Sequence, residues 1–135
     1  TTEIYTLSLH DALPILKRNL AKAERIPPGG LVVIRDGDPG DPEISLSPLT
    51  YLYSHRIPLE IAAYESATLS REQVLDAMLG AIGAAVMANR TLGGLCDWIE
   101  AEAPMTDDIE ALGALPGRFA DLAILAVYAT TDPLN

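Results

Sequence analysis

Apolar and polar residues alternate along residues 49–63, and this period of two predicts a long strand with one buried face. Pro58 falls inside the run, where it indicates an edge, a bulge or a break, because proline has no N–H to give to a neighbouring strand. The residues on the predicted buried face are Leu49, Tyr51, Tyr53, His55, Ile57, Leu59, Ile61 and Ala63.

A helix is predicted directly after this strand. Ser70 and Gln73 have the spacing of a capping box, in which each side chain hydrogen-bonds to the backbone of the other residue. Apolar residues then recur at helical spacing up to Asn89, and Gly93-Gly94 breaks the chain before a short strand over residues 95–99. The apolar positions are Val74, Leu75, Met78, Leu79, Ile82, Ala85 and Val86.

Shorter elements are predicted on either side of this block. Residues 31–34 are a β-branched run and predict a strand. Residues 36–43, DGDPGDPE, are turn-forming, so we expect an exposed hairpin loop that residues 44–47 connect to the long strand. Residues 120–129 are apolar on both faces, which predicts a central strand covered on both sides.

Two segments give weaker patterns. Apolar residues lie on one side of residues 16–25, which predicts a short helix that ends at the turn residues 27–30. Residues 100–117 are rich in acidic residues and predict a loop.

Composition indicates a single domain. At 135 residues and 49% hydrophobic, the chain can bury a core but is too short for two ordinary domains. Its most apolar run, residues 78–87, is well short of a membrane span. Nine basic and 19 acidic residues give a formal net charge of -10, which argues against direct nucleic-acid binding, since phosphate contacts need clustered lysine and arginine. We therefore expect no direct contact with nucleic acid or membrane.

Residues 1–15 require separate treatment. Their sequence TEIYTLSLHDALPI, from Thr2 to Ile15, resembles the peptide obtained when a short-read sequencing adapter is translated. We therefore predict a non-native leader over residues 1–15 and a single native domain over residues 16–135. The alternative is a natural amphipathic leader in which Asp11 caps a helix with Pro14 near its first turn.

The loop predicted over residues 36–43, which we call the acidic loop, is the first place to look for a metal site; its carboxylates are Asp36, Asp38, Asp41 and Glu43. Its carboxylates could offer hard oxygen ligands to calcium. However, their spacing does not fit the twelve-residue calcium loop, and two prolines interrupt it, so a solvated acidic turn is the better interpretation. No metal ligand or cofactor is predicted.

Two residues outside the loop could take part in catalysis. His55 could form a proton relay with Glu60 or Asp97, but its place on an apolar strand face favours a hydrogen-bonded structural histidine. Cys96 is the only cysteine, which excludes an internal disulfide, and no activating base adjoins it in sequence, so we interpret it as a small buried hydrophobic residue. The glycine pairs 29–30 and 93–94 could cradle a phosphate, but they are placed as turns. We predict no catalytic residue and no enzyme.

Three blocks of sequence resemble one family. They are IPPGGLVVIRDGDPGDPEISLSPLTYLYSHRIPLEI, TLGGLCDWIEAEAP and AVYATTDPL, within a match from about Arg18 to Leu134. This family comprises small tail proteins of phages and prophages, encoded in the tail-morphogenesis clusters of long-tailed phages and of gene transfer agents in alphaproteobacteria. Its members are similar to tail terminator, or minor tail, proteins of the lambda type, and some carry an acyl-CoA transferase label.

The resemblance implies a fold of the α/β (α+β) class. The sheet would be mixed and mostly antiparallel, with about four or five strands packed against one or two helices. It also implies a short strand near residues 15–19, where the pattern favours a helix, and this conflict stays open.

The resemblance also implies a structural role in the virion tail, with assembly in the host cytoplasm. The protein would form a homo-oligomeric ring, a hexamer by analogy with tail tubes, that caps the tail tube and contacts the head–tail connector. Alternatives are a head–tail joining or connector completion protein on the same fold and, less favoured, an acyltransferase. We expect the acidic loop to contact arginines of a neighbouring copy, and the candidate interaction surface consists of Arg35, Asp36, Asp38, Asp41, Glu43, Arg56 and Arg90.

Overall fold

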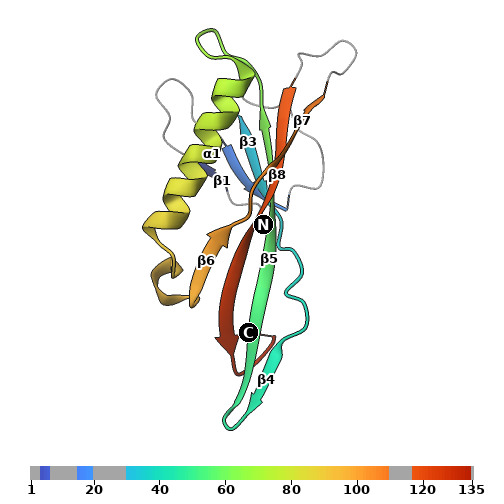
Figure 1. The fold of residues 1–135 in the computed structure, drawn as a ribbon, viewed down its shortest axis with the longest axis vertical. Coiled ribbons are helices and arrows are strands. Elements are labelled where there is room, and N and C mark those ends of the chain that lie inside the picture. The colour runs from blue at the N-terminus through green and yellow to red at the C-terminus, as the bar shows by residue number, and fades with distance from the viewer. Residues whose placement is uncertain (1–3, 7–14, 20–29, 110–116, 135) are drawn as a thin grey trace.

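The computed structural model of the chain describes residues 4–6, 15–19, 30–109 and 117–134. In these residues eight strands form one sheet, and one α-helix packs against one of its faces (Figure 1). All strand pairs are antiparallel except β2 with β3, so the predicted α+β class and the mixed, mostly antiparallel sheet are confirmed. The strand count exceeds the expected four or five, because several short flanking strands have weak local patterns.

Two long strands form the centre of the sheet. They are β5 (Leu49–Ala63) and β8 (Gly117–Thr130), and they pair through thirteen residue pairs. The period-two pattern therefore predicted β5 correctly. The central position predicted for β8 is also confirmed, since both of its edges are paired. The cover predicted on both of its faces is not found among the described residues, where α1 covers one face alone. Because the register does not change along the ladder between β5 and β8, alternate residues of each strand stay on the same face of the sheet throughout.

Each long strand is flanked by two short strands in succession. Along β5, the first partner is β4 (Glu43–Leu46) and the second is β3 (Leu31–Ile34). Along β8, the first partner is β7 (Met105–Ile109) and the second is β6 (Trp98–Ala101). The loop predicted over residues 100–117 is thus wrong for β7, and the strand predicted over residues 95–99 begins later, at Trp98.

The remaining two strands extend the sheet beyond β3. β2 (Ile15–Arg18) runs parallel to β3, and β1 (Ile4–Thr6) is paired with β2 alone among the described residues. The helix predicted from residue 16 is therefore wrong at this point, and the strand implied by the family resemblance is correct. Pairing with β3 outweighs a local helical pattern. The turn predicted at residues 27–30 lies outside the described residues except for Gly30.

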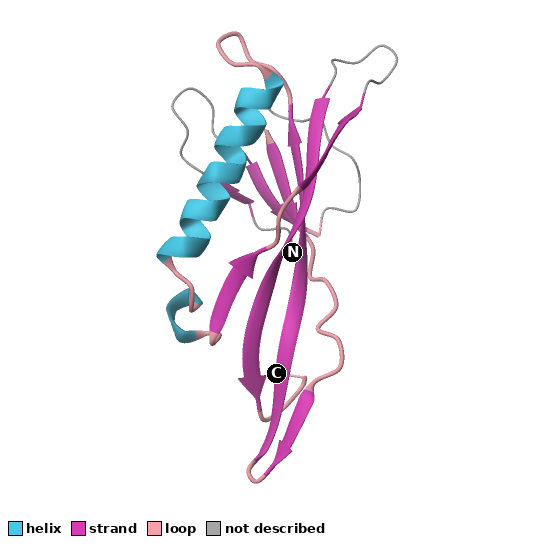
Figure 2. Cartoon of the chain, viewed as in Figure 1, coloured by secondary structure: helices cyan, strands magenta, loops and turns pink. Residues whose placement is uncertain are grey.

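The helix α1 (Arg71–Ala88) begins and ends as predicted. Ser70 Oγ accepts the Gln73 N–H at 3.2 Å, and Gln73 Oε1 accepts the Ser70 N–H at 2.9 Å, which completes the capping box. Asn89 is the C-cap. The helix lies across one face of the sheet (Figure 2). Its buried residues are Val74, Leu75, Met78, Ile82 and Val86.

The core fills the space between α1 and the sheet. The sheet contributes the odd-numbered residues of β5 and the even-numbered residues of β8, which alternation places on the face toward α1. Gly30 allows a close approach at the edge of this core: it has a φ of 88°, and a Cβ there would collide with the Met78 side chain and the Ala62 carbonyl oxygen. The sheet's main core residues are Val32, Leu59, Ile61, Ala63, Ile99, Ala120, Leu122 and Ala126.

An arm projects from the helix-covered part of the molecule. We define it as β4, the first half of β5 and the C-terminal end of β8, which together extend beyond α1 (Figure 1). In the arm, the face of the sheet that α1 covers elsewhere therefore has no helix over it.

The loop of residues 35–42 connects β3 to β4. Its exposure is as predicted, but it is not a hairpin, since β3 and β4 lie one after the other along the same edge of β5. At this edge the Pro58 carbonyl oxygen accepts the Arg35 N–H at 2.9 Å. A residue of an antiparallel strand directs its nitrogen and its carbonyl to the same side. Pro58 thus turns its nitrogen toward the gap between β3 and β4, where its missing N–H costs no ladder hydrogen bond, although β5 itself is a central strand and not an edge strand.

Candidate functional site

Asp36 belongs to the predicted interaction surface, and it forms hydrogen bonds with Arg18 and Asn19 of its own chain. Arg18 of β2 places Nε 2.8 Å and Nη2 2.7 Å from Asp36 Oδ1. Asn19 Oδ1 accepts the Asp36 N–H at 2.9 Å. The hydrogen bond from Arg18, and then the side-chain interaction with Asn19, lowers the pKa of the Asp36 carboxyl group from its usual value. Asp36 thus ties the loop to β2.

Two arginines of the predicted surface are also in ion pairs within the chain. Arg35 Nη2 lies 2.7 Å from Glu60 Oε2. Arg56 binds Glu102 in a bidentate manner, with Nη2 3.0 Å from Oε2 and Nε 3.1 Å from Oε1, and these hydrogen bonds raise the pKa of Arg56. In a single copy, carboxylates of the same chain bind both Arg35 and Arg56, so the predicted contact with a neighbouring copy would have to compete with these pairs and stays a prediction.

Arg90 lies apart from the other predicted surface residues, after the C-terminal end of α1. Its Nη1 donates to the Ile99 carbonyl oxygen at 3.0 Å, and the Ile99 N–H donates to the Arg90 carbonyl oxygen at 2.8 Å. Among the described residues it forms no ion pair with a carboxylate, and it is exposed. Its charge is available to a partner.

The other acidic residues of the loop remain exposed. Asp38 Oδ1 accepts the Gly40 N–H at 2.8 Å, which is a local turn, and the Asp38 backbone bridges to Arg56. Gly37 permits this approach to β5, since a Cβ there would collide with the Arg56 carbonyl oxygen. Within the described residues, no group of three or more His, Cys, Asp or Glu side chains is placed to hold a metal ion. The geometry fits a solvated turn against β5.

His55 links the loop to the central strands. Its Nε2 lies 2.6 Å from the Asp36 carbonyl oxygen and its Nδ1 lies 3.0 Å from the Tyr128 hydroxyl oxygen. The Tyr53 and Tyr128 rings pack beside it with centroids 5.6 Å apart. Desolvation, and then the proximity of Tyr53, raises the pKa of Tyr128. The prediction of a half-buried structural histidine is confirmed, and neither Glu60 nor Asp97 is its hydrogen-bond partner.

Cys96 lies between the short 3-10 helix η1 (Leu92–Gly94) and β6. Its Sγ is 3.9 Å from the Arg90 carbonyl oxygen, and its half-buried side chain packs against the core. The thiol fills space at the core boundary, in a turn and not in the strand that the sequence predicted.

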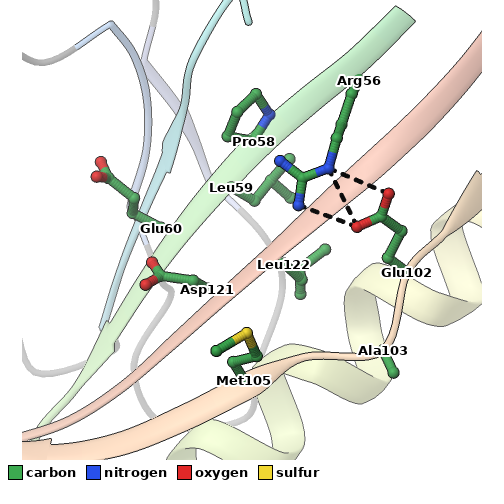
Figure 3. Close-up of a pocket in the computed structure, with 9 residues that line it drawn as sticks. All are labelled: Arg56, Pro58, Leu59, Glu60, Glu102, Ala103, Met105, Asp121 and Leu122. Carbon is green, nitrogen blue, oxygen red and sulfur yellow. Dashed lines mark hydrogen bonds and ion pairs between the residues drawn. The ribbon is translucent and has the colours of Figure 1, made fainter. Parts of the chain in front are cut away.

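A cavity of about 270 Å³ lies where β5, β8 and β7 meet (Figure 3). Arg56 and Glu102 line one side, Met105 another, and Glu60 faces Asp121 across the ladder. Like charges directly opposite on a sheet repel, and Arg35 offsets this repulsion through its ion pair with Glu60. Because Glu60 and Glu102 are already paired, the cavity offers a small polar recess and no assembled reactive group.

Sequence analysis missed two exposed apolar surfaces. The first, which we call the tip patch, lies on the arm and consists of Ile44, Leu46 and Leu49, whose side chains are 57%, 81% and 47% exposed. The second, which we call the helix-end patch, consists of Met87, Leu92 and Leu95, which are 71%, 43% and 84% exposed. The alternation of apolar residues with serine over residues 44–47 was a signal for the first. No local pattern indicates the second, because its residues come from two elements and a turn.

No protein-family model matches this sequence, and no curated protein matches it. Among the described residues, no helix is both long enough and apolar enough to cross a membrane.

Proposed function

We propose that this chain is a structural phage tail protein, a tail terminator that forms a homo-oligomeric ring, caps the tail tube and joins it to the head connector. The observation that carries the proposal is the arm, which presents large aliphatic side chains to solvent beyond the core. Clustered exposed aliphatic residues are characteristic of protein interaction sites, whereas single ones are common on any surface.

The sequence resemblance supports the same role. The block LSPLTY, which is part of the resembling sequence, forms the end of β4, the turn between β4 and β5 and the start of β5, so residues that carry the resemblance build the end of the arm. A ring needs two different patches on each protomer, since each copy contacts its two neighbours through different surfaces. The tip patch and the helix-end patch satisfy this requirement.

The charge of the chain supports a position around a DNA channel. A net charge of -10 leads to repulsion of phosphate, so DNA could pass through the ring without binding to it. The exposed Asp38, Asp41 and Glu43 remain candidates for contact with basic residues of the tail tube protein.

An acyltransferase is less compatible with the described geometry. Acyl transfer through a cysteine needs a base in reach of the thiol. His55 directs both ring nitrogens to Tyr128 and Asp36, and the hydrogen-bond partner of Cys96 is a backbone carbonyl.

Electron microscopy of phage tails made with and without the protein tests this function. Tails of unregulated length in its absence, restored to uniform length when the wild-type gene is supplied, are the expected result. Tails of normal length that fail to join heads would identify the connector completion role instead. Normal tails joined to full heads would rule out both.

A further inference from the structure

The outer face of α1, which is turned away from the sheet, is apolar over about its last three turns. From Ala77 to Ala88 the helix has no polar side chain on any side. Its buried residues form one face, and Gly80, Ala84 and Met87 are exposed on the other, with Met87 71% exposed. A helix that is apolar all round is typically buried. A single copy therefore leaves uncovered a helix face that has the composition of a buried one.

Gly80 makes a hole in this outer face. A Cβ at Gly80 would meet no atom within 4 Å, and the same is true at Gly83, so neither glycine is needed for packing within one copy. Glycine is a poor helix former and destabilises the interior of a helix relative to alanine. A glycine that the single copy does not need, in a helix that would be more stable without it, indicates that another chain approaches the backbone there.

Met87 supplies a projection that matches the hole. It follows Gly80 by seven residues, or about two turns, so the two residues lie nearly one above the other on the same face. Met87 is also the one large apolar side chain of α1 that is exposed. Such a face is complementary to itself only when the second helix runs in the opposite direction, because Met87 of each copy then lies over Gly80 of the other.

The charges of α1 favour the same antiparallel arrangement. The exposed Glu72 and Asp76 lie in its first two turns, and the next acidic residue is Asp97, whose N–H donates to the Val127 carbonyl oxygen in the sheet layer. Parallel helices would place Asp76 beside Asp76 of the other copy, and like charges at close range repel. Antiparallel helices separate the two acidic ends and bring each to the end of the joint where the exposed Arg90 of the other copy lies.

We infer that two copies of the chain pair through the outer faces of α1, with the helices antiparallel and Met87 of each copy seated at Gly80 of the other. The two-fold axis passes the helices between Gly83 and Ala84, midway between hole and projection. The contact is isologous, so it closes at two copies. Because one helix from each copy makes a small interface, the pair forms and separates reversibly.

This inference goes beyond the proposed ring. Met87 also belongs to the helix-end patch, so a copy in the pair cannot offer that whole patch to a neighbour in a ring. The pair is therefore the state of the free chain before assembly, and it opens when the ring forms.

Filling the hole tests the pair in the full chain. Gly80→Leu adds a side chain at a position where a single copy has free space, but the leucine would occupy the place of Met87 of the other copy. Ala85→Leu is the matched control, since it adds the same side chain at an exposed residue of α1 that lies about 140° around the helix from Gly80. Thermal unfolding verifies the fold of each variant, and sedimentation velocity measures association over a concentration series.

We expect the wild type and Ala85→Leu to form a dimer and no larger species, and Gly80→Leu to associate at least about tenfold more weakly. Met87→Ala should weaken association at least about threefold, because it removes a side chain from the centre of the interface. A chain with both Gly80→Leu and Met87→Ala exchanges hole and projection, so it should associate more strongly than Gly80→Leu alone. Parallel helices would show no such recovery, since leucine would then meet leucine.

Every other result overturns the pair. A wild type that stays monomeric overturns it and would leave the outer face of α1 to a different protein. A wild type that assembles into a ring overturns it while supporting the proposed function. If Gly80→Leu dimerises like the wild type, another surface joins the copies. If the double variant associates no more strongly than Gly80→Leu, Met87 does not meet Gly80 and the antiparallel arrangement is wrong.

Discussion

The Nδ1 atom of His55 lies 3.0 Å from the hydroxyl oxygen of Tyr128, across the ladder between β5 and β8. The other ring nitrogen, Nε2, faces the carbonyl oxygen of Asp36, which can only accept a hydrogen bond. We therefore assign the proton of the neutral imidazole to Nε2, so that Nδ1 accepts the Tyr128 O–H. The contact of His55 with Asp36 fastens the loop of residues 35–42 to β5, and the contact with Tyr128 joins His55 to β8.

We predict that His55→Ala destabilises the folded chain by about 1–3 kcal/mol, because it removes a part-buried hydrogen bond to Tyr128, whose hydroxyl loses its partner, and an exposed one to the Asp36 carbonyl oxygen. Tyr128→Phe removes only one of these bonds and should cost about 1 kcal/mol. Urea unfolding measures both values. Equal stabilities of His55→Ala and the wild type would show that the ring does not fasten the loop.

Stability should also fall at alkaline pH because of Tyr128. Burial raises the pKa of Tyr128 from 10.0, so above the unfolded-state pKa the folded chain retains a proton that the unfolded chain has lost. The free energy of unfolding should therefore decrease as pH rises above about 10, up to the folded-state pKa. Tyr128→Phe should reduce this slope relative to the wild type in urea unfolding at pH 9 to 11. An identical slope in both proteins would refute the assignment.

Asp36 should titrate below its usual pKa of 3.8 in the folded chain, since Arg18 and Asn19 stabilise its carboxylate. Stability from this group is present above the unfolded-state pKa and is lost as pH falls through the folded-state pKa. Carboxyl NMR titration should show the Asp36 pKa rising in Arg18→Gln. An unchanged Asp36 pKa in the variant would contradict the ion pair.

Met78 and Gly30 should be energetically coupled in the core. Met78 is fully buried, and Met78→Ala should cost about 2–5 kcal/mol through lost burial and a cavity. Gly30→Ala should also destabilise, because its added Cβ collides with Met78 and its φ is positive. The double variant should cost less than the sum of the single variants, since alanine at 78 removes one collision. Additive costs in chemical unfolding would place the two residues out of contact.

Sequence alone determined the elements whose signals are local. The alternation along β5, the β-branched run of β3 and the capping box of α1 each follow from residues within a few positions of one another, so they could be predicted without knowing their neighbours. The exposure of the acidic loop followed in the same way from its turn-forming residues. Pairing is not encoded locally, and that is why the loop was mistaken for a hairpin.

Tertiary structure decided the elements that depend on a distant partner. β2 is a strand because β3 lies beside it, and β7 is a strand because it completes the edge of β8. The ion pair of Arg56 with Glu102 joins residues 46 positions apart, and the contact of His55 with Tyr128 joins residues 73 apart. The partners of these polar side chains could not be predicted from the sequence, because each partner is distant along the chain. The two apolar patches are exposed for the same reason: α1 covers only part of the face that the long strands provide, and only the assembled fold shows where its cover ends.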